Sequence, residues 1–202
     1  MPSFDYRRRM GPVPSAAPAD PYLASDTFDR TDNASLGNTD GGSLGSLAWT
    51  ESNADGFSIE SNKLKALATD RTAYIDVLDA DIVVSAVLNL KAGRSLGIVA
   101  RLSDNDNYIM AYLREGAEKL VLYSKEAGSY TVRAEDTVTV NADTDYTVAL
   151  SCVGTAIVAT VNGGTPVPWT SSFNQAATKV GLYSGDANGD GSNFNDFTAE
   201  AG

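Results

Sequence analysis

The stretch Ile82-Val83-Val84-Ser85-Ala86-Val87-Leu88-Asn89-Leu90 decides the fold of this chain. Every even position in it is apolar, whereas the odd positions include Ser85 and Asn89. Strict alternation is typical of a β-strand with one buried face, because successive side chains of a strand point to opposite sides of the sheet. We therefore predict a strand over 82–90 whose even-numbered side chains face a core.

Two more strands are expected directly after this one, giving three consecutive antiparallel strands in the middle of a β-sandwich. Residues 91–94 turn the chain, and apolar residues alternate again from Leu96 to Leu102, with Arg101 on the opposite face. A polar turn at 103–107 leads into the third strand. Both of its faces are apolar or aromatic, with Tyr108, Met110 and Tyr112 on one side and Ile109, Ala111 and Leu113 on the other. We expect both faces to be covered.

The rest of the chain repeats this pattern of short strands and polar turns. Asn162-Gly163-Gly164 is a strong tight-turn signal, and no segment of useful length has a helical period. Strands spaced in this way are typical of all-β proteins. We predict an all-β, two-sheet antiparallel jelly-roll sandwich over residues 26–202, preceded by an extended arm, rich in proline and alanine, over residues 1–25.

The composition excludes several classes of function. The 202 residues include 15 Lys and Arg against 26 Asp and Glu, for a net charge of −11, so the body of the chain is expected to repel nucleic acid. The absence of histidine removes the usual general base and the commonest zinc ligand. The single cysteine, Cys152, cannot form an intrachain disulfide, and its place in an alternating apolar pattern predicts a buried side chain.

The segment 1–25 has no apolar periodicity, as expected of an extended arm. Its three adjacent arginines stand out in an otherwise acidic chain. Two interpretations stay open, namely a disordered tail and a segment that becomes ordered on a neighbouring subunit. On the second interpretation, the residues that contact the partner are Phe4, Tyr6, Arg7, Arg8, Arg9 and Tyr22.

Several motifs resemble one superfamily of β-sandwiches. Gly97-Ile98-Val99-Ala100-Arg101-Leu102-Ser103-Asp104-Asn105-Asp106-Asn107-Tyr108 resembles the strand-loop-strand motif of the concanavalin A-like (laminin G/pentraxin-like) jelly rolls. Val161-Asn162-Gly163 and Val180-Gly181-Leu182-Tyr183 are similar to a hairpin turn and a closing strand of the same superfamily. The opening Asp26-Thr27-Phe28-Asp29-Arg30, together with Trp49, is similar to the start of such domains in virion proteins of tailed bacteriophages, especially minor tail proteins. This resemblance implies the fold more specifically than the function.

Oxygen-bearing side chains near the C-terminus are spaced as in a calcium-binding loop, and the superfamily often binds calcium at an edge of the sandwich. The candidate ligands are Asp186, Asn188, Asp190 and Asp196. The twelfth position of the loop is Phe197 instead of glutamate, which excludes an EF-hand. Calcium is the one cofactor suggested, and completion of its site by Asp26 and Asp29 stays open, as does the alternative of a plain turn.

The loop Asp104-Asn105-Asp106-Asn107 is a candidate glycan-binding segment, because the superfamily that the chain resembles includes many lectins. Its side chains can hydrogen-bond sugar hydroxyls, but they are also ordinary turn formers, so a solvated hairpin loop is the alternative. Trp49 is a candidate platform for a sugar ring, and the alternative for both Trp49 and Trp169 is packing at the edges of the sandwich.

A glycosidase related to this superfamily would need two carboxylates that flank the scissile bond. The Glu-x-Asp-x-x-Glu strand signature of jelly-roll endoglucanases is absent, and the glutamates are scattered among polar loops. We assign no catalytic residue and predict that the protein is not an enzyme.

These features lead to two hypotheses. The first is a non-enzymatic structural component of a bacteriophage virion, either a minor tail protein or a capsid-surface decoration protein, that displays its jelly roll outward and binds other virion proteins through the arm. We expect many copies or a homo-oligomer on the virion surface, made in the host cytoplasm without a signal peptide and without membrane insertion. The alternative is a lectin-like carbohydrate-binding module that recognises host-surface glycans.

Overall fold

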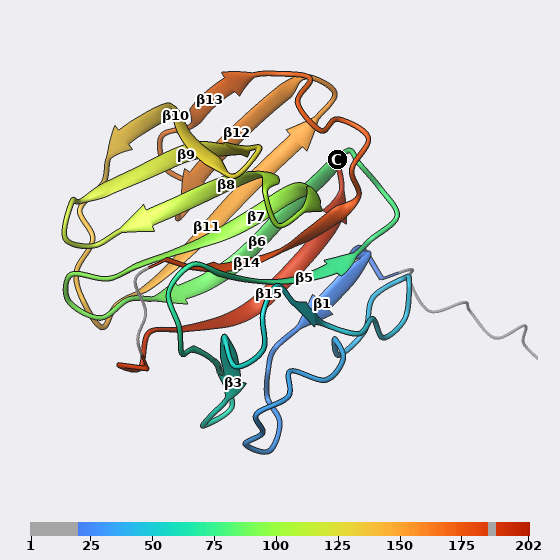
Figure 1. Cartoon of the computed structure of the whole chain (residues 1–202), viewed down its shortest axis with the longest axis vertical. Coiled ribbons are helices and arrows are strands. Elements are labelled where there is room, and N and C mark those ends of the chain that lie inside the picture. The colour runs from blue at the N-terminus through green and yellow to red at the C-terminus, as the bar shows by residue number, and fades with distance from the viewer. Residues whose placement is uncertain (1–19, 186–188) are drawn as a thin grey trace, which may run out of the picture.

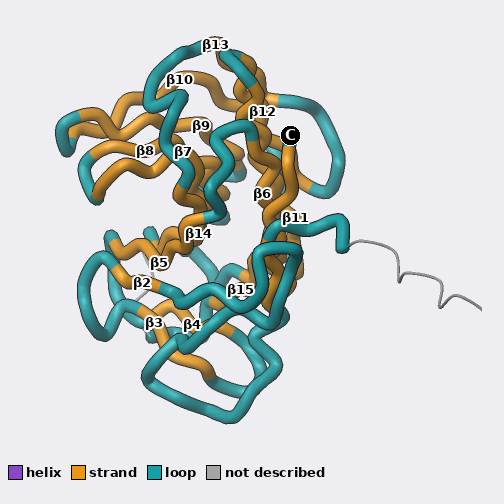
Figure 2. The backbone as a smooth tube through the Cα atoms, turned by 90° about the vertical axis from the view of Figure 1, so that its right-hand side faces the viewer, coloured by secondary structure: helices purple, strands orange, loops and turns teal. Residues whose placement is uncertain are grey.

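The computed structural model describes residues 20–185 and 189–202, and this part of the chain contains fifteen strands and no helix. Figure 1 shows the strands, and Figure 2 shows that they form two layers packed face to face. All pairings are antiparallel, so the predicted two-sheet jelly-roll sandwich is confirmed. No helix able to span a membrane is found in the described residues.

The sheets have eight and seven strands. The eight-stranded sheet runs in the order β13-β12-β11-β6-β15-β4-β3, with β1 paired to β15. Its strands are β1 (Ala24–Asp26), β3 (Phe57–Ile59), β4 (Leu64–Ala66), β6 (Ile82–Asn89), β11 (Asp145–Val153), β12 (Ala156–Val161), β13 (Val167–Thr170) and β15 (Asn193–Ala201). The seven-stranded sheet runs in the order β10-β9-β8-β7-β14-β5-β2. Its strands are β2 (Thr50–Glu51), β5 (Arg71–Asp76), β7 (Ser95–Asp104), β8 (Asn107–Arg114), β9 (Lys119–Glu126), β10 (Ser129–Thr137) and β14 (Lys179–Ser184).

The three central strands form where the sequence predicts them, but they are divided between the two sheets. β6 lies between β11 and β15 in the eight-stranded sheet, whereas β7 and β8 pair with each other in the seven-stranded sheet. The loop 91–94 therefore carries the chain from one layer to the other. On the far side of β7 lies β14, which in turn pairs with β5.

Alternate side chains of the two sheets fill a single core between them. The even-numbered residues of β6 are buried as predicted, in one cluster with Ile98, Ile109 and Leu113 of the opposite sheet. Cys152 is fully buried in the same cluster, and burial raises the pKa of its thiol to about 12, as expected for an unreactive core residue.

A bulge at Arg101 overturns the predicted alternation at the end of β7. Arg101 has a φ angle of 50°, and the pairing of β7 with β8 shifts register beside it. Leu102 consequently lies on the outer face instead of following Leu96 into the core, and the Arg101 side chain is fully buried. Its guanidinium donates a hydrogen bond to the carbonyl oxygen of Gly154 at 2.6 Å. Bulges commonly re-aim side chains in this way.

The N-terminal part of the described chain is tied into the sandwich through β1. The carboxylate of Asp26 is buried and accepts hydrogen bonds from Trp49 Nε1 at 2.7 Å and from the Arg30 guanidinium at 2.9 and 3.0 Å. Trp49 packs between Phe28 and Phe197, with ring centroids 5.8 and 5.0 Å away. The opening segment therefore contributes both a strand and a buried polar anchor.

Candidate functional site

The outer face of the seven-stranded sheet is aromatic, although an antiparallel sheet usually presents polar side chains on its outer face. Six of the nine tyrosines of the chain lie on this face. We call them the tyrosine face, and they are Tyr74, Tyr108, Tyr112, Tyr123, Tyr130 and Tyr183. Five of them pack with Val99, Leu102 and Met110 in a second apolar cluster, separate from the core.

The rings of the tyrosine face fix one another mainly by edge-to-face packing. The ring of Tyr183 lies 6.3, 5.6 and 6.4 Å from the rings of Tyr108, Tyr112 and Tyr130. Tyr123 lies 6.0 Å from Tyr112 and 6.2 Å from Tyr130. Aromatic rings favour this geometry because the positive edge of one ring meets the negative face of the next. The result is a rigid aromatic floor.

The tyrosine face is concave, because a hydrogen bond joins residues from near its two edges. Tyr130 belongs to β10 at one edge of the sheet, yet its hydroxyl donates to Oδ1 of Asp70, at the start of β5 near the other edge, at 2.7 Å. Figure 2 shows β8, β9 and β10 on one side of the layer and β5 and β2 on the other. The hydroxyl of Tyr183 also donates to Asp70 Oδ1, at 3.0 Å, and that of Tyr108 lies 2.7 Å from the hydroxyl of Tyr130.

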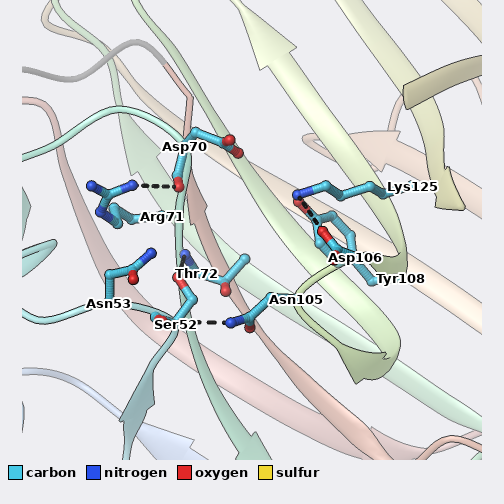
Figure 3. A pocket seen from close by; sticks show the side chains of 9 residues that line it. All are labelled: Ser52, Asn53, Asp70, Arg71, Thr72, Asn105, Asp106, Tyr108 and Lys125. Carbon is cyan, nitrogen blue, oxygen red and sulfur yellow. Dashed lines mark hydrogen bonds and ion pairs between the residues drawn. The ribbon is translucent and has the colours of Figure 1, made fainter. Parts of the chain in front are cut away.

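Two hollows adjoin on this concave face. The first, which we call the polar hollow, has a volume of about 180 Å³ (Figure 3). It is lined by Ser52, Asn53, Asp70, Arg71, Thr72, Asn105, Asp106, Tyr108 and Lys125. The second, the aromatic hollow, has a volume of about 210 Å³ and is lined by Met110, Tyr112, Tyr123, Tyr130 and Tyr183. They adjoin because Tyr130 and Tyr183, in the wall of the aromatic hollow, are bonded to Asp70, in the wall of the polar one.

Lys125 places a cation between the two hollows. The residue is only 9 % exposed, and its Nζ lies 5.4 Å from the ring centroid of Tyr108 and 5.0 Å from that of Tyr130. The nearest carboxylate oxygen, Asp106 Oδ1, is 3.8 Å away, which is beyond hydrogen-bonding distance. The ammonium group is therefore held by ring faces and keeps donors for other partners.

Protonation states on this face follow from its burial and its hydrogen bonds. Asp70 is an exposed residue, and the partial desolvation of its carboxylate opposes ionisation. The hydroxyls of Tyr130 and Tyr183 and the positive charges of Lys125 and Arg71 outweigh this effect, so the pKa of Asp70 lies below its ordinary value. Burial raises the pKa of Tyr130 and Tyr183, so both phenols stay neutral donors. At neutral pH Asp70 is therefore ionised and can only accept hydrogen bonds.

Only part of the predicted glycan-binding loop 104–107 lies at the polar hollow. Asn105 and Asp106 line the polar hollow, and the side chain of Asn105 donates to the Ser52 carbonyl oxygen at 3.5 Å. Asp104 Oδ1 instead accepts bonds from the Asp106 N–H and the Asn107 side chain, each at 2.8 Å, which hold the turn.

Trp49 lies in the interior and not on a surface that a sugar ring could reach. Its side chain is packed and hydrogen-bonded at the N-terminal segment as described above, because the indole N–H satisfies the buried carboxylate of Asp26. Trp169 is half-buried, and the Arg133 guanidinium lies 5.1 Å from its ring.

The candidate calcium ligands are only partly described. Asp186 and Asn188 lie outside the described residues. The carboxylate of Asp190 contacts the Arg94 guanidinium and accepts a bond from the Ser192 N–H at 3.1 Å, whereas Asp196 lines a separate depression with Asp29. In residues 20–185 and 189–202, no three acidic or cysteine side chains gather as metal ligands would. Calcium binding stays a prediction, which a thermal midpoint measured with calcium and with chelator would test.

Most of the predicted partner-contacting residues, namely Phe4, Tyr6, Arg7, Arg8 and Arg9, also lie outside the described part of the chain. Tyr22 is described and half-buried, and its carbonyl oxygen accepts a hydrogen bond from the Ser43 N–H at 2.8 Å. Contact of these residues with a partner stays a prediction.

Sequence reasoning did not identify Asp70, Arg71 or Lys125 as site residues. One part of the signal was present, since Tyr108, Met110 and Tyr112 were placed on one face of their strand. The other tyrosines of the face come from β5, β9, β10 and β14, and Asp70 directly precedes β5, so only the order and curvature of the sheet bring these residues together.

Comparison with known proteins supports the fold. No family model and no curated protein sequence matches the chain. The carbohydrate-binding module CBM66 from Bacillus subtilis is 15 % identical with a TM-score of 0.62, over 75 % of this chain and 94 % of that one. Domain 4 of AbnA, a GH43 extracellular arabinanase from Geobacillus stearothermophilus solved in complex with arabinotriose, is 14 % identical with a TM-score of 0.59, over 91 % of this chain and 94 % of that one.

The GH43 protein BlXynB from Bacillus licheniformis is 14 % identical with a TM-score of 0.63, and the match covers 89 % of this chain but only 39 % of that one. None of these three proteins is named as a virion component. At such low identity the likeness concerns architecture alone. The chain has the jelly-roll β-sandwich fold of these carbohydrate-binding and GH43-associated domains, consistent with the concanavalin A-like resemblance.

Proposed function

We propose that the protein is a non-enzymatic carbohydrate-binding module and that its ligand lies on the tyrosine face and in the adjoining polar hollow. The observation that carries this proposal is the juxtaposition of a rigid aromatic floor with a hollow lined by Asp, Asn, Arg and Lys side chains. A sugar ring has both an apolar face of C–H groups and a rim of hydroxyls, so it matches both surfaces at once.

Energetic considerations favour a ligand over a purely structural role for this face. The core between the sheets is complete without it, because the tyrosine face forms a separate cluster on the opposite side of the seven-stranded sheet. An aromatic cluster that remains partly open to solvent gains further stabilisation when a partner covers it. The likeness of the fold to CBM66 and to the arabinotriose-bound domain of AbnA adds support of a general kind.

A glycan array followed by calorimetric titration tests the proposal. The variant Tyr123→Ala removes one half-buried ring of the aromatic hollow, and Tyr22→Ala removes a half-buried ring outside it. We expect Tyr123→Ala to weaken binding of an array-selected oligosaccharide by about tenfold, whereas Tyr22→Ala leaves it unchanged. An array without any bound glycan, or equal effects of both variants, would sink the proposal.

The expected placement on a bacteriophage virion rests on the sequence resemblance and on the arm, and it stays a prediction. It is compatible with glycan binding, because display in many copies would let weak individual contacts act through avidity. Particles assembled with a chain that lacks residues 1–19 would test attachment through the arm, and normal incorporation of that chain would argue against it.

A further inference from the structure

The most constrained group on the concave face is the carboxylate of Asp70. Its Oδ1 accepts hydrogen bonds from Tyr130 at 2.7 Å and from Tyr183 at 3.0 Å, and these two hydroxyls are themselves 3.1 Å apart. The backbone of Asp70 has a φ angle of 55°, which is uncommon for a residue other than glycine. Twelve other non-glycine residues of the described chain have a positive φ, Asp143 among them, so the angle helps to direct the Asp70 side chain but does not distinguish this residue.

The other oxygen of this carboxylate is left for a partner. No group of the described residues donates a hydrogen bond to Asp70 Oδ2, and Asp70 lines the polar hollow. Figure 3 shows Asp70 at the upper rim of this hollow and Lys125 on its right-hand side, with the Asp70 carboxylate on the side toward Lys125. An ionised carboxylate is an acceptor only, and an ammonium is a donor only. A ligand between them must therefore both donate and accept, as a hydroxyl does.

Two further polar atoms in the wall of the hollow lack partners within the protein. Arg71 Nε and Thr72 Oγ1 are buried and make no hydrogen bond, and Thr72 is only 3 % exposed. Both atoms are almost inaccessible to solvent, so the polar atoms that an occupant of the hollow can reach are those of Asp70 and Lys125.

The charge balance argues for an uncharged occupant. The hollow is lined by two carboxylates, Asp70 and Asp106, and by two cations, Arg71 and Lys125, so its formal charge is zero. The chain as a whole carries a net charge of −11. An anionic glycan would meet the carboxylates at close range and the repulsive field of the whole protein at long range.

The size of the hollow limits the occupant to a small group. Its volume of about 180 Å³ lies below the range of roughly 300–1,000 Å³ that is usual for pockets that hold a drug-sized ligand. On one side of the hollow, the hydrogen bond from the Asn105 side chain to the Ser52 carbonyl oxygen joins two segments of its wall. The adjoining aromatic hollow offers room for the next part of a chain.

We infer that the polar hollow takes a single uncharged sugar residue, with one hydroxyl donating to Asp70 Oδ2 and a neighbouring hydroxyl accepting from Lys125 Nζ, while the attached chain lies over the tyrosine face. This inference rests on the proposed function and specifies the class of glycan. Tyr130 and Tyr183 act here as positioning residues, since they hold the carboxylate without contacting that hydroxyl.

The test compares matched neutral and acidic probes on the intact chain. An array would carry arabinotriose, xylotriose and galactotriose beside trigalacturonic acid, and lactose beside sialyllactose and sulfated lactose. We expect binding among the neutral probes, at least tenfold weaker binding of their acidic counterparts, and little dependence on salt. Binding that is confined to the acidic probes would overturn the inference but leave the proposed function standing, whereas no binding to any probe would overturn the proposed function itself.

Substitutions then locate the contact for the neutral probe that binds. Asp70→Asn keeps the shape and tolerates the positive φ angle, and Lys125→Met keeps the stem over the two rings, so both variants are expected to fold. Each should weaken binding by at least tenfold. The matched controls are Asp143→Asn, which also has a positive φ angle of 59°, and Lys91→Met, its ion-pair partner outside the hollow.

The controls should bind the neutral probe as the parent chain does. If Asp70→Asn and Lys125→Met bind it unchanged while Tyr123→Ala does not, glycan binding is retained on the tyrosine face and the polar hollow is excluded as its site. Circular dichroism and the thermal midpoint of each variant separate loss of contact from loss of fold.

Discussion

The hydroxyl of Tyr130 and the carboxylate of Asp70 meet at 2.7 Å, although the two residues are 60 positions apart in the chain and lie near opposite edges of a seven-stranded sheet. The bond links β10 to the start of β5 across the tyrosine face. It therefore fixes the curvature of the sheet and the direction of the carboxylate at the same time.

Tyr130→Phe tests this bond. The variant keeps the ring and removes the hydroxyl, so Asp70 loses one of its charge-assisted hydrogen bonds, and we expect the free energy of unfolding to fall by about 1–2 kcal/mol. Chemical denaturation measures the change, with Tyr22→Phe as the control on a tyrosine outside this face. An unaltered unfolding free energy would mean that the bond does not brace the sheet.

The pH dependence of binding follows from the lowered pKa of Asp70. In the folded chain the pKa of Asp70 lies below its ordinary value of 3.8. The stabilisation from the ionised carboxylate is therefore fully present above the pKa that Asp70 has in the unfolded chain, and it is lost as the pH falls through the lower pKa of the folded chain. We expect affinity for the neutral glycan to be constant from about pH 7 to about pH 5 and to fall once the carboxylate is protonated. Titration at several pH values measures it, and Asp70→Asn should abolish this fall. A loss of affinity that begins near neutral pH would contradict the assignment.

Trp49→Phe tests the polar anchor of the N-terminal segment. The variant deprives the buried Asp26 carboxylate of its donor at 2.7 Å and leaves space between Phe28 and Phe197, so we expect a loss of about 2–3 kcal/mol in unfolding free energy. Trp169→Phe is the control, because it makes the same substitution at a tryptophan that is only half-buried. Its unfolding free energy should fall by less than about 1 kcal/mol. Equal costs in denaturant titrations would show that the bond to Asp26 adds nothing beyond packing.

Truncation separates the arm from the sandwich. Removal of residues 1–19 leaves every described contact in place, so the thermal midpoint should not change. Removal of residues 1–26 deletes β1 and the Asp26 carboxylate. This leaves one edge of β15 unpaired and takes the acceptor away from Trp49 Nε1 and Arg30 Nη2, so it should cost at least about 2 kcal/mol. Differential scanning calorimetry of both chains is the measurement. An equally stable shorter chain would mean that β1 is dispensable.

The sequence by itself determined the local features of this protein. The alternation of β6 predicted its buried face, since side chains of a strand alternate whatever its neighbours are. Asn162-Gly163 predicted a tight turn, and both residues have positive φ angles, 49° and 64°, as such a turn requires. The two apolar faces of β8 likewise predicted burial on both sides. Its odd-numbered residues from Ile109 to Leu113 lie in the core, and on the outer face Tyr108 and Met110 are buried in the second apolar cluster while Tyr112 is half-buried.

Only the tertiary structure decided which of these faces meet. A strand pattern specifies which side chains share a face but not which strands become neighbours, because pairing depends on contacts between segments far apart in the chain. The division of β6 and β7 between the two sheets, and the bulge that buries Arg101, are results of that pairing. The meeting of Asp70 with Tyr130 requires, in addition, the curvature of a whole sheet, and the candidate site exists only because that curvature places a carboxylate, an ammonium group and an aromatic floor around one hollow.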